Sequence, residues 1–357
     1  MIAPDRTRAL RPASRGFTLV DLLGVIASMG VLVGMLLPAV QSAREAARRS
    51  SCSNNCRQLA IAIQGFASAR ASYPPSMLHT PGTTFVSNYG SWSIHGRILP
   101  FIEESSAASR VNLEQAWDDG FTTGSPDPSK NWATVGKTRI RSFFCPSDIN
   151  GVFRTKNGVD YVFPHTYGFN HGTWFVYDPA TGVGGDGSFH PNSRFLPSSF
   201  SDGLSRTLCL SEVKAFTPDV RTTADPGPTP PADPAGVSGM SAGGDAKLGA
   251  TTNDCTGHTE WPDGRVHHSG FTTVFVPNTP VPHVSGGSTH DININSRQEG
   301  SSATQRTYAA ITSRSHHRRA VNVAMMDGST ITIADSIDLA VWRALSTRAG
   351  GETTNFK

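Results

Sequence analysis

The chain has 357 residues, and Gly (35) and Pro (24) together make up about a sixth of it. Both residues interrupt helices, so this composition argues against a mainly helical protein, yet it falls short of the level typical of a disordered chain. The formal charge of +3 comes from the first 16 residues, where four Arg stand against one Asp, and the remainder carries no net charge. We therefore expect no nucleic-acid partner. An apolar content of 37% is enough for a sizeable core.

Residues 17–37 form an apolar run of 21 residues with a single charge, Asp21. As a helix this run is ~31 Å long, which matches the hydrocarbon thickness of a bilayer. We predict a single membrane pass, with the basic leader 1–16 in the cytoplasm and the rest of the chain outside it. A cleaved signal peptide is the alternative, but it predicts a shorter apolar stretch followed by a small-x-small cleavage site. A buried core helix is a second alternative.

Asp21 is the informative residue of this run, because a carboxylate inside a membrane helix is costly and usually has a partner or a function. Cleavage between Gly16 and Phe17 would place a new α-amine near membrane depth, and Asp21 of a neighbouring chain could neutralise it. The alternative is an interfacial Asp tolerated near the helix end. Gly30 and Gly34 form a small-xxx-small pair that permits close helix contact.

Residues 15–23 (RGFTLVDLL) resemble the prepilin-type cleavage and methylation motif of type IV pilins and type II secretion pseudopilins. The resemblance implies that a prepilin peptidase cuts after Gly16 and methylates the amine of Phe17, and that related pilin-type subunits are partners. The fifth residue after the cut is normally glutamate, and Asp21 is one methylene shorter. Pro38 falls where pilin helices commonly carry a kinking proline.

Beyond the apolar run, the alanine-rich segment 38–70 has apolar positions at helical spacing and predicts the head half of one long spine helix. The stretch 50–55 (SSCSNN) is a poor helix former, and a break is expected there. Residues 71–357 predict a β-rich head, with strands in the runs 85–102, 159–170, 172–178 and 270–278. Residues 217–250, rich in Pro, Gly, Ala, Thr and Asp, are interpreted as a flexible insertion.

The carboxyl end predicts a β-hairpin, because 320–326 and 330–334 alternate in polarity around Asp327-Gly328, a favoured tight turn. Asp335 or Ser336 can cap a closing helix with Leu339, Trp342 and Leu345 on one face, and we interpret Trp342 as a packing residue.

Several blocks resemble one large bacterial family that joins a prepilin-type amino terminus to a β-rich head, catalogued as domain of unknown function 1559. They are residues 51–55, 143–148, 200–216, 258–278 and 315–352. The family's terminal signature, His followed by nine residues and Asp-Gly, is met by His317, Asp327 and Gly328. We interpret these three as structural, with His317 bonded to backbone near the Asp327 turn. The resemblance implies no reaction.

The five cysteines lie at 52, 56, 145, 209 and 255, and an odd count leaves at least one outside intramolecular disulfides. An exported head lies in a disulfide-permitting compartment. Cys52 and Cys56 share a helix face but suit a disulfide poorly, so a bridge from Cys52 to Cys145 is the pairing we favour. No C-x-x-C occurs, and we predict no zinc site.

Histidines at 258, 267–268 and 316–317 lie near acidic residues that include Glu260, Asp263 and Asp327, so a metal-dependent hydrolase can be considered. It would bring three or more His, Asp or Glu side chains together within metal-ligand distance. No H-E-x-x-H, G-x-S-x-G or phosphate-binding glycine loop occurs. If each adjacent pair lies on a strand, it supplies at most one ligand to a site. A membrane-tethered binding module for a glycan or protein would instead expose Trp92, Trp174 and Trp261 in a cleft.

Together these features predict an α+β, pilin-like fold with a helical spine, a β-rich head and a C-terminal hairpin and helix. The predicted function is that of an inner-membrane pseudopilin-like structural subunit of a type II secretion or pilus-like assembly. We expect no enzyme activity, no cofactor and no metal, and we expect prepilin peptidase and pilin-type subunits as partners.

Overall fold

The computed structural model describes residues 19–84, 92–102, 105–114, 117, 135–156, 158–249 and 256–352. The predicted leader and the predicted cleavage site at Gly16 and Phe17 lie outside the described residues. The chain divides into two compact units, Met1–Ala47 and Arg48–Lys357. The described residues of the first unit form the amino-terminal part of a helix, and the second unit is the head.

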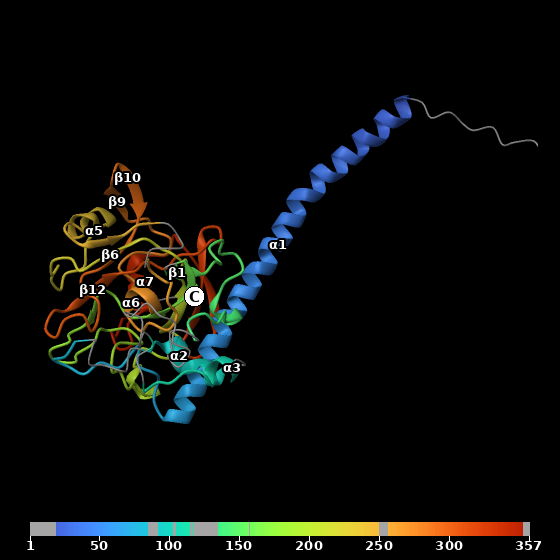
Figure 1. Ribbon diagram of the computed structural model, residues 1–357. Helices are drawn as coiled ribbons and strands as arrows, with labels where there is room; N and C mark the ends of the chain where they lie inside the picture. Colours follow the sequence, from blue (N-terminus) through green and yellow to red (C-terminus); the bar gives the residue numbers. More distant parts are fainter. Residues whose placement is uncertain are drawn as a thin grey trace, which may run out of the picture. The chain divides into compact units, whose positions relative to one another are not determined.

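One helix, α1 (Leu19–Arg70), runs through the predicted spine without interruption (Figure 1). It continues across Pro38 and also across 50–55, where we expected a break. Tertiary contacts explain the second result. Asn55 donates hydrogen bonds to the carbonyl of Phe144 (3.2 Å) and to the hydroxyl of Tyr167 (3.3 Å), and that hydroxyl donates to the Cys52 carbonyl (3.3 Å). Packing of this kind outweighs weak intrinsic propensity.

The central sheet of the head has the strand order β14-β13-β5-β3-β8. Its strands are antiparallel except for the parallel pair of β3 and β8. Their bounds are β3 Tyr167–Asn170, β5 Leu208–Glu212, β8 Gly270–Phe271, β13 Ala320–Met325 and β14 Thr330–Ala334. The strands β3, β5 and β13 are buried along their whole length, which requires packing on both faces of the sheet.

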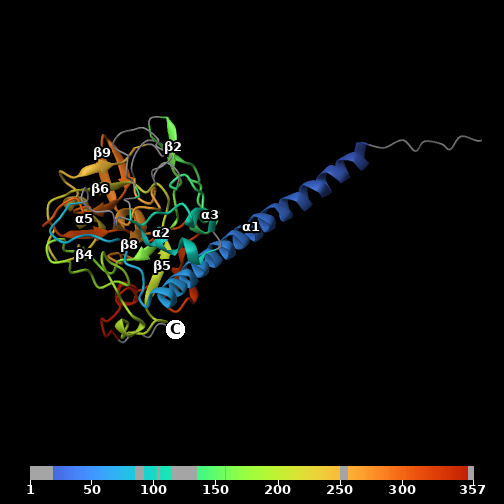
Figure 2. The ribbon, with the colours of Figure 1, turned by 60° about the horizontal axis from the view of Figure 1, so that its bottom comes forward.

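Two apolar cores cover the two faces of this sheet. Alternate residues of β13 belong to different cores, as the pleat requires: Val321 and Val323 to one and Ala324 to the other. The core of Ala324 contains the face of α1 that carries Cys52, Cys56, Leu59, Ala60, Ala62 and Ile63. This part of α1 belongs to the head unit and runs beside the sheet (Figure 2). The opposite core contains Trp342 of α7 (Leu339–Ala344), which is fully buried and therefore a packing residue.

A second five-stranded sheet has the order β4-β12-β11-β6-β7, antiparallel except between β11 and β6. Its strands are β4 Phe175–Tyr177, β6 Asp219–Arg221, β7 Asp245–Lys247, β11 Asn293–Asn295 and β12 Thr307–Ala310. Two hairpins complete the strands: β1 Arg154–Lys156 with β2 Val159–Val162, and β9 Pro282–Ser285 with β10 Ser288–Asp291. In Figure 1 the second hairpin lies beside α5 (Pro234–Met240), and α5 contacts β9.

In the described residues the head also contains short helical turns: α2 Ile94–Ile98, η2 Leu99–Phe101, α3 Ser105–Ala108, η4 Arg141–Phe143, η5 Pro197–Ser199 and α6 Val266–Ser269. The predicted strand over 85–102 is wrong where the structure describes it, because Ser93 caps α2 by accepting a hydrogen bond from the Gly96 amide (3.2 Å). Residues 85–91 lie outside the described part.

The interpretation of 217–250 as a flexible insertion is also wrong. This stretch supplies β6, α5 and β7, and Val220 and Val237 are fully buried in one core with β-strand residues. The composition of this stretch gave no local signal for β6 and β7, because these short strands form only when they pair within a sheet. The closing helix is capped by Asp338, whose carboxylate accepts from two backbone amides, and not by Asp335 or Ser336.

Candidate functional site

The amino-terminal part of α1 is an apolar surface. Every described residue from Leu19 to Ala43 is exposed, and α1 has the length and hydropathy to cross a membrane. A signal sequence would share these properties. Asp21 lies in the first described turn, and a methyl group added at Gly30 or Gly34 would have no neighbour within 4 Å. These glycines therefore leave room for another helix to approach.

In the head, Cys52 of α1 and Cys145, just after η4, form a disulfide, with their Cα atoms 5.0 Å apart. Cys56 and Cys209 are buried free thiols, and Cys255 lies outside the described residues. Because Cys52 and Cys145 are 93 residues apart, the bond ties the helix to a distant loop of the head. Burial raises the pKa of the Cys209 thiol and that of the Cys56 thiol, so neither is an activated nucleophile.

His317 packs against this disulfide. Its Nε2 lies 3.2 Å from Oε1 of Glu212 at the end of β5 and 3.7 Å from Sγ of Cys145. The backbone partner near the Asp327 turn that we predicted for this ring stays a prediction, and Glu212 and Cys145 are contacts that the sequence did not indicate. Asp327 and Gly328 do form the tight turn between β13 and β14. The Asp327 carboxylate accepts from the Ser329 amide (2.8 Å), and Gly328 has φ +88°, which favours glycine.

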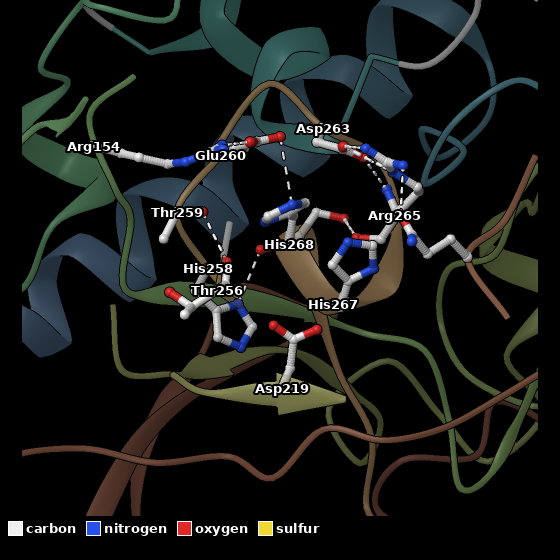
Figure 3. A network of polar contacts seen from close by, with 12 residues as sticks. Arg154, Asp219, Thr256, His258, Thr259, Glu260, Asp263, Arg265, His267 and His268 are labelled. Atoms are coloured by element: carbon white, nitrogen blue, oxygen red, sulfur yellow. Dashed lines mark hydrogen bonds and ion pairs between the residues drawn. The ribbon is translucent and has the colours of Figure 1, made fainter. Parts of the chain in front are cut away.

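A second buried polar network surrounds α6 (Figure 3). The carboxylate of Glu260 pairs with Arg154 and lies 3.4 Å from Nε2 of His268, and Asp263 pairs with Arg265. Glu260, Asp263 and His268 are at most 3% exposed. One ligand atom from each lies within 4.8 Å of the others, so the convergence expected of a hydrolase is present. Each of the two carboxylates nevertheless already pairs with an arginine guanidinium, which supplies the positive charge that a metal cation would otherwise provide.

His267 and His268 lie on the helical turn α6 with ring centroids 4.3 Å apart, so the limit of one ligand for a pair on a strand does not apply to them. Figure 3 shows both rings on the same side of the loop that carries Glu260 and Asp263. Burial and the cations of Arg221 and Arg265 lower the pKa of His267 well below its usual value. Burial, the adjacent His267 and nearby arginines do the same for His268. Both rings are therefore neutral at physiological pH.

Further histidines extend this neutral region. The ring centroids of His95 and His165 are 4.4 Å apart, and those of His165 and His258 are 5.6 Å apart. Nε2 of His165 and Nδ1 of His258 both bond the His268 carbonyl, at 2.6 and 2.9 Å. Burial lowers the pKa of His165 to about 4 and that of His258 to about 3. These hydrogen bonds join α6 to the segment before β3 and to the turn at His258, which gives the histidines a structural role.

The tryptophans named for a binding cleft are buried in the part of the chain that the structure describes, and none of the three is exposed. Trp92, Trp174 and Trp261 are at most 2% exposed, and Trp92 packs against Trp261 with centroids 6.4 Å apart. A hollow of about 730 Å³ beside α1 is lined by mixed side chains, among them Asn55, Gln58, Phe101 and Arg141, and by no tryptophan.

The candidate residues that the sequence missed are Glu212, Asn322 and the arginine partners of the acidic cluster. Two sequence features could have indicated these residues: Glu212 lies inside the apolar strand LCLSE, and Glu260 lies beside Trp261. Carboxylates in such apolar surroundings are rarely buried without a partner.

Comparison with protein families and with known proteins completes the description. The family model described as "Protein of unknown function (DUF1559)" matches residues 41–340. No curated protein and no solved structure gives a significant match. Because the match covers most of the chain and contains the His317, Cys52 and Glu212 segments, the chain belongs to the DUF1559 family.

Proposed function

We propose that the protein is a membrane-anchored, pseudopilin-like structural subunit of a type II secretion or pilus-like assembly. Prepilin peptidase would process it between Gly16 and Phe17, with the amino end in the cytoplasm and the head outside. The carrying observation is the exposed apolar segment of α1 with Asp21 in its first described turn, directly after the sequence RGFTLV.

The physical support begins with the surface of this helix. Its Leu, Val, Ile and Met side chains between Leu19 and Leu37 are 41–75% exposed. Each such side chain gains ~1.5–3 kcal/mol when it is transferred from water to an apolar environment. A bilayer or neighbouring helices supply that environment, whereas water does not.

Asp21 supplies the second support. Within an apolar environment its carboxylate requires a counter-charge, and the α-amine released at Phe17 is four positions away in sequence. In an assembly, the Asp21 carboxylate of one chain would neutralise the Phe17 amine of the next and so fix the axial register of the two helices.

The buried carboxylates of the head support a structural role, because they are paired with other side chains of the protein. Glu260, Asp263 and Glu212 are buried, and each has an arginine, histidine or asparagine partner. The buried tryptophans leave the binding-module alternative without its expected cleft.

The test is assembly in membranes that contain an active prepilin peptidase. A photo-crosslinking residue at Leu22, beside Asp21, should join chains into dimers and longer ladders. Asp21→Asn keeps the shape and removes the charge, so it should reduce the crosslinked fraction about tenfold. Asp21→Glu should keep it.

Asp160→Asn, which removes an exposed carboxylate of the head, is the matched control and should leave crosslinking unchanged. Equal crosslinking of the wild-type and Asp21→Asn chains would contradict the proposed pairing. Absence of any crosslinked species in the wild type would contradict assembly itself.

A further inference from the structure

Four potential ligands from four distant segments meet inside the head. They are Cys52 on α1, Cys145 after η4, Glu212 at the end of β5 and His317 before β13. One ligand atom of each lies within 4.8 Å of those of the others, and all four residues are buried. In the oxidised chain the two sulfurs are bonded to each other.

We propose that reduction of the Cys52–Cys145 disulfide turns this cluster into a Zn²⁺ site with the ligands Cys52, Cys145, His317 and Glu212. This proposal is independent of the pseudopilin-like function. It revises the expectation of no zinc site, which rested on the absence of ligands close together in the sequence.

The geometry of the two ligands outside the disulfide carries the argument. In a tetrahedral zinc site, Zn–S bonds of ~2.3 Å and Zn–N or Zn–O bonds of ~2.0–2.2 Å place S and N about 3.6 Å apart and N and O about 3.4 Å apart. Nε2 of His317 lies 3.7 Å from Sγ of Cys145 and 3.2 Å from Oε1 of Glu212. Both separations agree with these values within about 0.2 Å.

Hydrogen bonds with neighbouring residues hold the Glu212 carboxylate and the backbone of His317 in place. Glu212 is held by Asn322, whose backbone amide donates to Oε2 (2.7 Å) and whose side-chain amide donates to Oε1 (3.2 Å). The His317 amide donates to the Ser315 hydroxyl (3.1 Å). Such outer contacts fix the orientation of metal ligands and strengthen binding. In the oxidised state His317 uses Nε2 towards Glu212, and as a ligand it would bind zinc through that atom.

The redox state of Cys52 and Cys145 decides whether the zinc site can form. A dithiol reductant gives two electrons and two protons to the disulfide, which becomes two thiols, and the reductant becomes a cyclic disulfide. Zn²⁺ then replaces the two thiol protons, which are released to solvent. The two thiolates and Glu212 bring three negative charges, and Zn²⁺ offsets two of them in a buried site. The disulfide and the metal are mutually exclusive, because zinc needs its two sulfurs about 3.8 Å apart.

The Glu260, Asp263 and His268 cluster does not support the same inference. Its carboxylates already pair with Arg154 and Arg265, so a cation would have to displace a guanidinium from each. In the cluster around His317 the Glu212 carboxylate faces a histidine, and two of the four ligands are the sulfurs that zinc prefers.

The experiment compares the full chain in detergent before and after reduction, with the reductant removed without air. The probe is Co²⁺, followed by Zn²⁺. The reduced chain should bind one Co²⁺ with thiolate-to-metal charge-transfer absorption and the intense visible bands of a tetrahedral site. One equivalent of Zn²⁺ should abolish both signals. The oxidised chain should show neither. These spectra require no variant, so misfolding of a mutant does not affect them.

Variants assign the ligands. Cys145→Ser and His317→Gln should each weaken Zn²⁺ binding by about 100-fold or more, which exceeds the usual effect of an outer-shell substitution. Cys56→Ser and Cys209→Ser are matched controls, because they also remove a buried thiol but lie outside the ligand set. They should bind as the wild type does, and near-ultraviolet circular dichroism should verify the fold of every variant.

Two outcomes would overturn the proposal. One is a reduced wild-type chain that binds no more Co²⁺ or Zn²⁺ than the oxidised chain. The other is a site that is lost in folded Cys56→Ser but kept in folded Cys145→Ser, since the ligands would then be different.

Discussion

Acidification from pH 7 to pH 5 is expected to destabilise the head, because several of its buried histidines are neutral when folded. Burial lowers the pKa of His165 to about 4 and the pKa values of His171 and His258 to about 3. An exposed histidine in the unfolded chain has a pKa near 6.5. Between these values the unfolded state binds more protons, so this stability is complete above pH 6.5 and is lost as the pH falls towards 4.

The magnitude follows from proton linkage. Lowering the pH from 7 to 5 reduces the free energy of unfolding by about 2 kcal/mol for each of these three histidines, or by about 6 kcal/mol together. Glu299 acts in the opposite direction. Burial raises its pKa to about 7, so its protonation stabilises the folded state at low pH. Between pH 7 and pH 5 it increases the free energy of unfolding by about 2 kcal/mol. The net loss is about 4 kcal/mol, and the lowered pKa values of His95, His190, His267 and His268 act in the same direction as the loss.

Urea unfolding of the detergent-solubilised chain, followed by tryptophan fluorescence at pH 7 and pH 5, measures this loss. With a slope of about 3 kcal/mol per molar, the midpoint should fall by more than about 1 M. His171→Leu should reduce the difference between the two pH values by about 2 kcal/mol. Neither ring nitrogen of His171 has a hydrogen-bond partner in the structure, so the substitution removes a titrating group without breaking a bond.

His290→Leu, in the outer hairpin strand β10, controls for loss of an imidazole as such and should leave the pH difference in place. A midpoint that is equal or higher at pH 5 would refute the reasoning, because it would mean that the buried rings are charged in the folded state.

Two further predictions concern the head. Replacing both Cys52 and Cys145 by Ser removes a crosslink between positions 93 residues apart and should cost about 4–5 kcal/mol by chain entropy, measured as a lower denaturation midpoint under non-reducing conditions. Replacing the free cysteines Cys56 and Cys209 in the same way leaves the crosslink intact, and an equal loss in that control would argue against the disulfide. Glu260→Gln should cost about 3–5 kcal/mol in urea unfolding, because it leaves the buried Arg154 cation uncompensated. Asp245→Asn, which breaks the half-exposed pair with Lys247, should cost under about 1 kcal/mol, and similar losses for the two variants would contradict the role given to burial.

The features predicted correctly from the sequence are those with local signals. The long helix follows from apolar spacing over many residues, and the β13–β14 hairpin follows from alternation around Asp327-Gly328. The features missed depend on contacts between distant segments. Residues 217–250 look like a linker until β6 pairs with β11, and the helix at 50–55 persists because Phe144 and Tyr167 bind it.

The candidate sites divide in the same way. Asp21 is recognisable because an acid in an apolar run is unusual at any position. The partners of His317 are not recognisable, because Glu212 lies more than a hundred residues away and joins it only when β5 and β13 pair. The local rule that adjacent histidines on a strand face apart fails at His267 and His268, because these residues form a helical turn.

The central claim is that the chain is matured as a pilin-type subunit, and mass spectrometry of the amino terminus tests it most directly. In cells with active prepilin peptidase, the mature protein should begin at amino-methylated Phe17, and cells without the peptidase should retain residues 1–16. An amino terminus at any other residue, or the same terminus with and without the peptidase, would contradict the account.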